Sequence, residues 1–443
     1  MLRVTQLPKF SFRHLAEMTV TSIFFRQTII FLRIITVNFP LKLNLSTYHI
    51  SKNSHNSEYL KGGMNIPSEI QAEILPDKNL SVIDFLKFPL PAVSRSPITN
   101  LHAYLSPLSP TITSTNEIKN IPTPPPTVLD KLIQSPDVAS SQSVLCPHAF
   151  GLTGERLPIW ILDYWNQVTR IRPVKVKWGA AEDNLQIQNK TSQDTKSLIN
   201  EVYNTLACLS WSVDIKGFWA SITSDYLTPY FTKEWFSDEQ ENQMLYLLQQ
   251  QVGRERSGDG IDITDTFFIK KLTEVFQKKE EYATKPAYTW IRKKGQELST
   301  GVYETLATIA NIDENHWVAV VLDFTGSRIQ YGDSMGVSID EDLEAVLTWW
   351  THQHTGRHFT TSYLPITRQR DGHSCGILAW NSLAVHIFPT TYSLIDLKAV
   401  AAERLRMFLQ IANRHNEKVC QNNVVDISLL NISSVFRSDS RRV

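Results

Sequence analysis

The sequence predicts an α+β fold, and three observations in its C-terminal half lead to this class. An apolar run from Trp317 to Leu322 is followed by a turn and a second short apolar stretch, which is typical of a hairpin. The residues after Ser237 place apolar side chains at helical spacing. A third run, directly after Cys375, has the apolar character of a buried helix. Helices and strands that alternate in this way indicate a mixed layer architecture.

Composition indicates a globular chain without a strong charge bias. The 443 residues are 42% hydrophobic and 20% charged, which is enough for two domains with proper cores. Lys plus Arg and Asp plus Glu both number 44, so nucleic-acid binding is not indicated. The cysteines lie apart, without a C-x-x-C pair, and a reducing compartment is expected; they are Cys146, Cys208, Cys375 and Cys420.

Residues 1–63 form an apolar and basic leader. Arg26 and Arg33 interrupt its apolar run, which argues against a membrane-spanning helix. The scarcity of acidic residues is similar to that of a mitochondrial transit peptide. The alternative, which we favour, is that this stretch is absent from the mature protein and that translation begins at Met64.

Residues 64–150 are rich in Pro, Ser and Thr, above all between about Lys87 and Ser143. Such a composition buries too little apolar surface to offset the entropy of ordering, so we expect this region to be a largely disordered linker. The next segment, 151–200, differs because Trp160, Trp165 and Trp178 lie close together in it. Aromatic residues at this density indicate an ordered segment that braces the following domain or docks a partner, with the brace preferred.

Residues 201–415 carry the remaining element predictions. A capping box at Ser237 and Gln240 begins a helix that ends near Gly253, and Ser338 with Glu341 begins another that ends at Gly356. Residues 359–364 are expected to form a strand, and 394–413 a closing helix. Residues 416–443 are expected to form a C-terminal tail.

Cys375 is the first candidate for chemistry. A thiol at the N-terminus of a helix lies at the positive end of the helix dipole, which favours the nucleophilic thiolate. The alternative is that Cys375 is a small core residue beside a turn, with a role in packing only. For an isolated cysteine, this alternative is the better interpretation.

Three further residues make the nucleophile interpretation stronger. His316 begins the first strand of the predicted hairpin and Asp333 follows the second, so the two side chains are expected to be close in space. An imidazole there can take the thiol proton while the carboxylate orients the ring. Gln369, six positions before Cys375, can supply an N–H to an oxyanion hole. Individually, these residues are also typical of a surface histidine, a turn and a solvated amide.

The order and spacing of these motifs resemble the Ulp1 family of cysteine proteases, which process ubiquitin-like modifiers such as SUMO. The motifs are H-W, then D-S 17 residues later (333 − 316), then Q-x5-C-G. The resemblance covers roughly residues 205 to 415 and implies a papain-like fold. It also implies that His316 is the general base, Asp333 its orienting partner, Gln369 the oxyanion donor and Cys375 the nucleophile. Ser374 departs from the pattern, because many members have Asp there.

The same resemblance implies substrate-binding residues. The segment K-E-W-F-S-D-E at residues 233–239 is similar to the family's W-L-x-D segment. Trp317 and Trp235 would then form opposite walls of a narrow tunnel for the modifier's Gly-Gly tail. Asp238 would contact a basic residue of the modifier. A tunnel of this kind selects by excluding side chains.

A zinc site is the competing interpretation of Cys375 and the histidines near it, which are His352, His354, His358 and His373. The first two lie at i,i+2 near the end of a predicted helix, where their side chains point apart and are poorly placed to bind one metal ion. We therefore expect no metal and no cofactor.

The sequence thus predicts a thiol protease or isopeptidase that cleaves after the Gly-Gly of a ubiquitin-like modifier, with SUMO preferred. The expected partners are that modifier and its conjugates, without membrane or nucleic acid, and a monomer in the nucleus or cytoplasm. Two alternatives stay open. One is an acetyltransferase that uses the same His, Asp and Cys, and the other is a non-catalytic modifier-binding protein of a mobile element.

Overall fold

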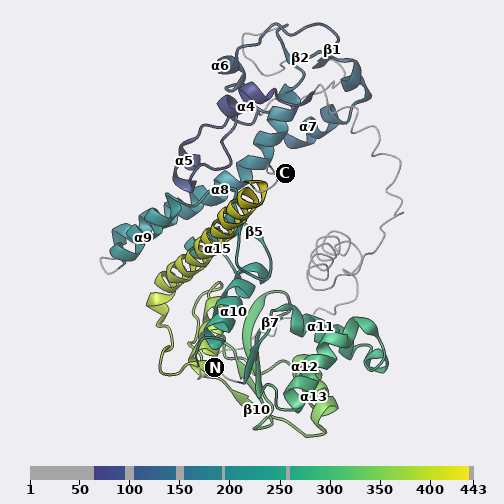
Figure 1. Ribbon diagram of the computed structural model, residues 1–443, viewed down its shortest axis with the longest axis vertical. Helices are drawn as coiled ribbons and strands as arrows, with labels where there is room; N and C mark the ends of the chain where they lie inside the picture. Colours follow the sequence, from purple (N-terminus) through teal and green to yellow (C-terminus); the bar gives the residue numbers. More distant parts are fainter. Residues whose placement is uncertain (1–63, 95–103, 146–153, 192–194, 256–259, 439–443) are drawn as a thin grey trace, which may run out of the picture. The chain divides into compact units, whose positions relative to one another are not determined.

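A computed structural model describes residues 64–94, 104–145, 154–191, 195–255 and 260–438 (Figure 1). All of them belong to one compact unit, which lies within Leu60–Val443. The predicted leader, residues 1–63, and Cys146 lie outside the described residues. Within the described ranges, no helix has the length and apolarity needed to cross a membrane.

A five-stranded mixed sheet carries the C-terminal half of the fold. Its strand order is β10-β9-β8-β7-β6, and the strands are Thr360–Tyr363, Arg328–Gly332, His316–Asp323, Thr305–Ile312 and Ile261–Ile263, respectively. The two outer pairs are parallel and the inner pairs antiparallel. The predicted hairpin is confirmed as β8 and β9, with Asp323 opposite Arg328 at the turn.

Both faces of this sheet are covered by helices (Figure 1). Alternate residues of β8 point to opposite faces, as the two-residue period of a strand requires. Trp317 and Val321 enter a core with α10 (Asp238–Val252) and α14 (Cys375–Ile387). Val318 and Val320 enter a second core with three other helices, which are α11 (Phe267–Phe276), α12 (Thr289–Ser299) and α13 (Glu341–Thr355). The α+β prediction is therefore confirmed.

The helix boundaries confirm one predicted cap and correct another. The capping box of Ser237 and Gln240 is present at the start of α10. Helix α13 ends at Gly356, as predicted, but its N-cap is Asp340 and not Ser338. The Asp340 carboxylate accepts hydrogen bonds from two backbone N–H groups of the first turn, which a residue two positions earlier cannot reach.

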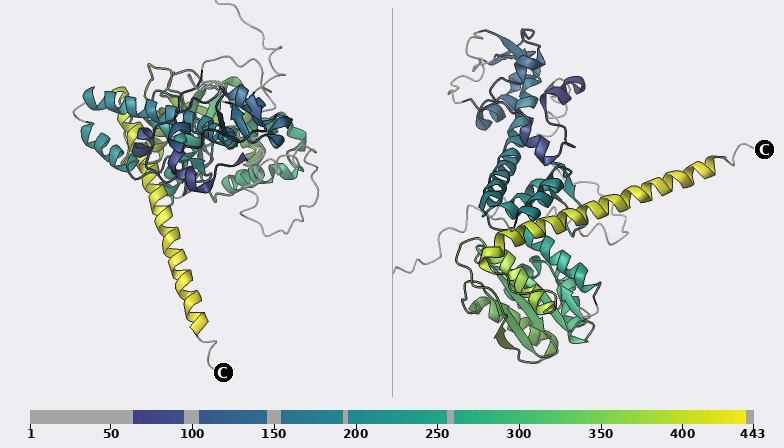
Figure 2. Two further views of the ribbon diagram at one scale, coloured as in Figure 1. Left: turned by 90° about the horizontal axis from the view of Figure 1, so that it is seen from above. Right: turned by 90° about the vertical axis from the view of Figure 1, so that its left-hand side faces the viewer.

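The closing helix differs from its prediction at both ends. A short 3-10 turn, η7 (Leu397–Ala399), precedes α15, which runs from Val400 to Ser438 (Figure 2). The expected range was 394–413, followed by a tail. The Asp396 side chain caps the turn at Lys398 and delays the helix start, and no Gly or Pro occurs between 400 and 438 to stop it.

The expectation of a disordered linker is wrong for much of residues 64–145. These residues form α4 (Ser68–Ile74), α5 (Val82–Lys87), α6 (Thr115–Ile118), α7 (Pro126–Ile133), η2 (Pro136–Ser140), β1 (Leu105–Ser106) and β2 (Ser143–Leu145). Leu129 and Leu132 belong to a core that this region shares with residues 157–168. The prolines misled the prediction, because Pro126 and Pro136 occupy first positions of helical turns, where the missing N–H costs nothing.

The Trp-rich segment contains β3 (Arg156–Pro158) and the long helix α8 (Ile161–Thr191). Trp165 belongs to the core of residues 64–168, and Trp178 to the core that also contains Cys375. Both rings are only 1% exposed. Lys177 of α8 forms an ion pair of 2.8 Å with Asp225. Helix α8 therefore joins the two cores, while its role as brace or docking surface stays a prediction.

Four of the remaining described elements lie between α8 and α10 in the chain, and the last two lie between α11 and α12. They are α9 (Lys196–Leu206), β4 (Asp214–Ile215), β5 (Ile222–Thr223), η3 (Ser224–Phe231), η5 (Lys279–Glu281) and η6 (Pro286–Tyr288).

Two glycines provide a matched test of helix formation. Gly356 has a φ of +66°, whereas Gly179 lies inside α8, and an added methyl group meets no atom within 4 Å at either position. Gly356→Ala should lower the free energy of unfolding by about 1–2 kcal/mol, because a left-handed backbone strains a Cβ atom. Gly179→Ala should raise it by about 0.5–1 kcal/mol. Urea denaturation measures both; changes of the same sign would contradict the assigned backbone conformations.

Candidate active site

Cys375 is the first residue of α14 and is only 1% exposed. The apolar residues that follow it are buried between the sheet, α10 and α15 and hold the helix in place. The thiol therefore lies beside the first backbone N–H groups of a 13-residue helix, at the positive end of its dipole. The predicted helix start at the cysteine is confirmed.

His316 and Asp333 lie at the open end of the hairpin. His316 is the first residue of β8, and Asp333 follows the last residue of β9. The Nε2 atom of His316 is 2.8 Å from Oδ1 of Asp333. That same oxygen accepts a 2.6 Å hydrogen bond from the backbone N–H of Met335, which fixes the carboxylate. The structure thus brings together the pair that the sequence predicted.

The charge state of His316 follows from its neighbours. Burial lowers the pKa of His316, but the hydrogen bond to Asp333, the neighbouring Cys375 thiol and the negative charges of both groups outweigh burial and raise the pKa to about 9. Nε2 is bound to Asp333, so Nδ1, which has no partner of good geometry among the described residues, is available to the thiol. The positive charge of His316 stabilises the folded state. Its contribution to the free energy of unfolding is fully present below about pH 6.5 and is lost as the pH rises through about 9.

Asp333 remains ionised in this environment. Burial raises the pKa of Asp333, but hydrogen bonds from His316 and from the backbone of Met335 and Gly336 outweigh it and lower the pKa below its usual value. A permanent negative charge on the far side of the ring favours the imidazolium form of His316. The geometry therefore supports a positively charged histidine next to a thiol, which is what a cysteine nucleophile requires.

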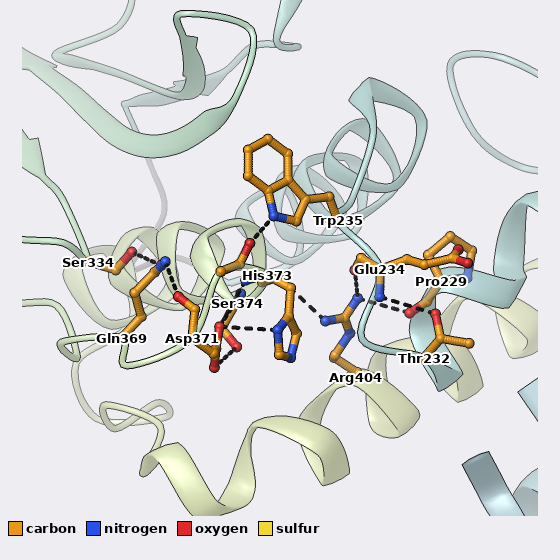
Figure 3. A network of polar contacts seen from close by, with 11 residues as sticks. Pro229, Thr232, Glu234, Trp235, Ser334, Gln369, Asp371, His373, Ser374 and Arg404 are labelled. Atoms are coloured by element: carbon orange, nitrogen blue, oxygen red, sulfur yellow. Dashed lines mark hydrogen bonds and ion pairs between the residues drawn. The ribbon is translucent and has the colours of Figure 1, made fainter.

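Gln369 is held at both ends of its side-chain amide (Figure 3). The Ser334 hydroxyl donates a 2.6 Å hydrogen bond to its Oε1, and its Nε2 donates a 2.8 Å bond to the carbonyl of Asp371. The backbone N–H of Gln369 also bonds to the Ser334 carbonyl at 2.9 Å. This orientation leaves the second N–H of Nε2 for another acceptor. Ser334, which the sequence reasoning missed, belongs to the D-S pair that carried the resemblance.

Asp371 organises the loop before the nucleophile and was also missed. Its Oδ1 accepts hydrogen bonds of 2.9 Å from the backbone N–H groups of His373 and Ser374, and its Oδ2 accepts one of 2.8 Å from the Ser374 hydroxyl. The indole N–H of Trp235 donates to the Gly372 carbonyl in the same loop (Figure 3). The D-x-x-S spacing, typical of an Asx turn, was the signal available in the sequence.

Arg404 of α15 is a third residue that the sequence reasoning did not single out. It is 2% exposed and donates a 2.9 Å hydrogen bond to the carbonyl of Pro229, with further bonds to the carbonyls of Glu234 and His373 (Figure 3). It ties the loop before Cys375 to the segment that carries Trp235. The carbonyl groups that it binds lie far from it in the sequence, so no local pattern indicates this role.

The predicted tunnel residues differ in exposure. Trp235 is 40% exposed, whereas Trp317 is 2% exposed and donates a 2.7 Å hydrogen bond to the carbonyl of Phe236. Asp238, in the first turn of α10, is exposed and accepts a 2.8 Å bond from the Thr266 hydroxyl. Trp317 thus packs behind the segment of Trp235, and the substrate contacts of all three residues stay predictions.

The histidines of the competing metal interpretation are not gathered at one place. His354 lies against Tyr282, with a ring nitrogen 2.7 Å from the phenol oxygen, while His373 contacts Asp371. Within the described ranges, no group of three or more His, Cys, Asp or Glu has the arrangement of a metal site.

Comparisons with known proteins place this site in a family. Residues 234–419 match the model of the Ulp1 protease family, C-terminal catalytic domain. No curated protein sequence was found to match the chain. The family assignment rests on the match to the family model.

Several solved structures are similar at low identity. The C-terminal Ulp1 protease domain in complex with Smt3, the yeast ortholog of SUMO, is 18% identical, with 49% of this chain and 92% of that one covered and a TM-score of 0.37. XopD of Xanthomonas campestris bound to ubiquitin is 18% identical, with coverage of 40% and 91% and a TM-score of 0.30. The Ulp1-like SUMO protease catalytic domain of Chaetomium thermophilum is 13% identical, with coverage of 50% and 89% and a TM-score of 0.35.

The family match covers all four predicted catalytic residues and favours a peptidase over the acetyltransferase and the non-catalytic alternatives. Residues 234–419 are similar to the catalytic domain of the Ulp1 protease family, and this similarity assigns them the activity of a cysteine-type peptidase.

Proposed function

We propose that this peptidase cleaves after the C-terminal Gly-Gly of a ubiquitin-like modifier, with SUMO as the preferred modifier. The observation that carries the proposal is that Cys375, at the start of α14, neighbours His316, whose Nε2 atom is bound to Asp333. The match to a family whose members act on SUMO-like proteins supports the substrate class.

In the proposed reaction, the Cys375 thiolate attacks the scissile carbonyl carbon and forms a tetrahedral intermediate. Its oxyanion accepts hydrogen bonds from the Gln369 amide and the Cys375 backbone N–H. The His316 imidazolium then gives its proton to the leaving amine, and a thioester with the modifier's terminal glycine remains. A water molecule that loses a proton to His316 hydrolyses this thioester and releases the modifier.

Substrate recognition is proposed to use the exposed face around Trp235 and Asp238. Trp235 is anchored through its N–H to the loop that precedes Cys375, so a tail that contacts this ring is led toward the nucleophile. Asp238 offers a carboxylate to a basic residue of the modifier. Both residues lie within the range that matches the family model, which supports a modifier as the partner of this face.

Modifiers whose C-terminal carboxylate is replaced by an electrophile test the substrate class directly. SUMO and ubiquitin carrying this group are incubated with the full chain, and mass spectrometry locates the adduct. We expect labelling at Cys375 by SUMO and loss of the adduct in Cys375→Ser. Cys208→Ser, which removes an exposed thiol, is the matched control and should label normally. Labelling of neither modifier, or equal labelling of Cys375→Ser, would contradict the proposal.

Asp333→Asn tests whether the negative charge of Asp333 raises the pKa of His316. The amide keeps an oxygen that accepts the Nε2 proton but removes the negative charge, so the pKa of His316 should fall from about 9. The alkaline limb of the kcat/KM profile should move to lower pH by about 1 to 3 units. Exposed Asp342 provides a control of equal charge in Asp342→Asn. An alkaline limb that does not move in Asp333→Asn would show that the carboxylate does not set this charge.

A further inference from the structure

Glu241 lies beside the nucleophile and takes no part in the mechanism described above. It belongs to α10, which packs against α14, and it is 0% exposed. A methyl group added at Gly376 would lie 1.9 Å from its Oε1 atom. The carboxyl group therefore fills the space next to the residue that follows Cys375, and glycine is required there for this close approach.

The carboxyl group of Glu241 is buried without a compensating partner. Neither of its oxygens has a hydrogen-bond partner among the described residues. It also forms no ion pair within 4.0 Å in this part of the chain. Buried Arg404 donates instead to backbone carbonyls, of which that of Pro229 is 2.9 Å away. A buried carboxylate without partners is costly, whereas a neutral carboxyl group is far less so.

The groups that face Glu241 come from four elements. Cys375 lies on α14, Arg404 on α15, Tyr230 on η3 and Asp238 on the same helix as Glu241. Burial first, and then the negative charge of Cys375, raise the pKa of Glu241 well above its usual value, while Arg404 opposes this effect. A negative charge on one of two adjacent acidic groups disfavours a second charge on the other.

We propose that Glu241 is a positioning residue that shares the first negative charge with Cys375, so that the thiolate forms only in part until both groups have lost their protons. The proposal rests on the assignment of Cys375 as the nucleophile. A role in packing alone does not account for the residue, because a leucine fills apolar space without burying two unpartnered oxygens. Glu241 would thus set the pH at which the nucleophile appears.

The pH dependence of alkylation by iodoacetamide tests the shared charge, because this small reagent reports on the thiolate without any modifier. In the native protein, modification of Cys375 should rise in two coupled steps. In Glu241→Gln it should rise in one step at lower pH, with a rate roughly tenfold higher on the acidic side, the change that one pH unit represents. Profiles that superimpose would overturn the proposal.

Glu239→Gln is the matched control, because it removes the same charge from a half-buried neighbour on the same helix. Its alkylation profile should follow that of the native protein, and a shift equal to that of Glu241→Gln would overturn a specific role for Glu241. Glu241→Met, which removes the charge with an apolar side chain of similar length, should reproduce the single step. This variant keeps the test available if the buried amide that Glu241→Gln introduces unfolds the protein.

The reciprocal measurement uses the carboxyl band of Glu241 in infrared difference spectra, assigned by its loss in Glu241→Met. Cys375→Ser removes the thiolate, so the pKa of Glu241 should fall relative to the native protein. An unchanged titration of this band would refute the coupling. Cleavage of SUMO does not enter either experiment, so failure of the coupling and failure of the proposed substrate remain distinguishable.

Discussion

The packing of α14 against β8 is the constraint on which the site depends. Cys375 reaches His316 only because the apolar face of α14 is buried against the alternate residues of β8 that point to the same core. Both elements are almost fully buried, so their relative position tolerates little movement. The first residue of α14 and the first residue of β8 are therefore held close together, which places the Cys375 thiol near the His316 imidazole.

The charged side chains near Cys375 and His316 are largely buried from water. Asp333 carries a fixed negative charge behind His316, and Arg404 carries a positive one whose terminal N–H groups donate to backbone carbonyls, while its Nε atom has no partner in the described structure. Glu241 differs from both, because neither of its carboxyl oxygens has a partner there. Burial strengthens each of these interactions and makes an unpaired charge expensive, so one proton can decide the charge of the whole cluster.

Local patterns in the sequence predicted much of this arrangement. The hairpin, the Ser237 capping box, the Gly356 helix stop and the helix at Cys375 were all indicated by residues close together in the chain. The positions of His316 and Asp333 followed from the hairpin, because the register of a hairpin brings its open ends together.

The features that were missed depend on partners distant in sequence. Arg404 bonds to Pro229, and Glu241 abuts Gly376, contacts that no local period reveals. The Pro-rich region was taken for a linker because composition does not show that Pro126 begins a helix whose apolar face packs against α8. Such tertiary contacts override a prediction made from composition.

His316 is held as an imidazolium by Asp333 on one side and Cys375 on the other. Histidine NMR titration of the full chain measures this most directly, with Cys375→Ser as the test variant and Cys208→Ser as the control. The account predicts that His316 titrates near pH 9 in the native protein and in the control, and at lower pH in Cys375→Ser. A His316 that titrates near 6.5 in the native protein, or identically in all three, would contradict it.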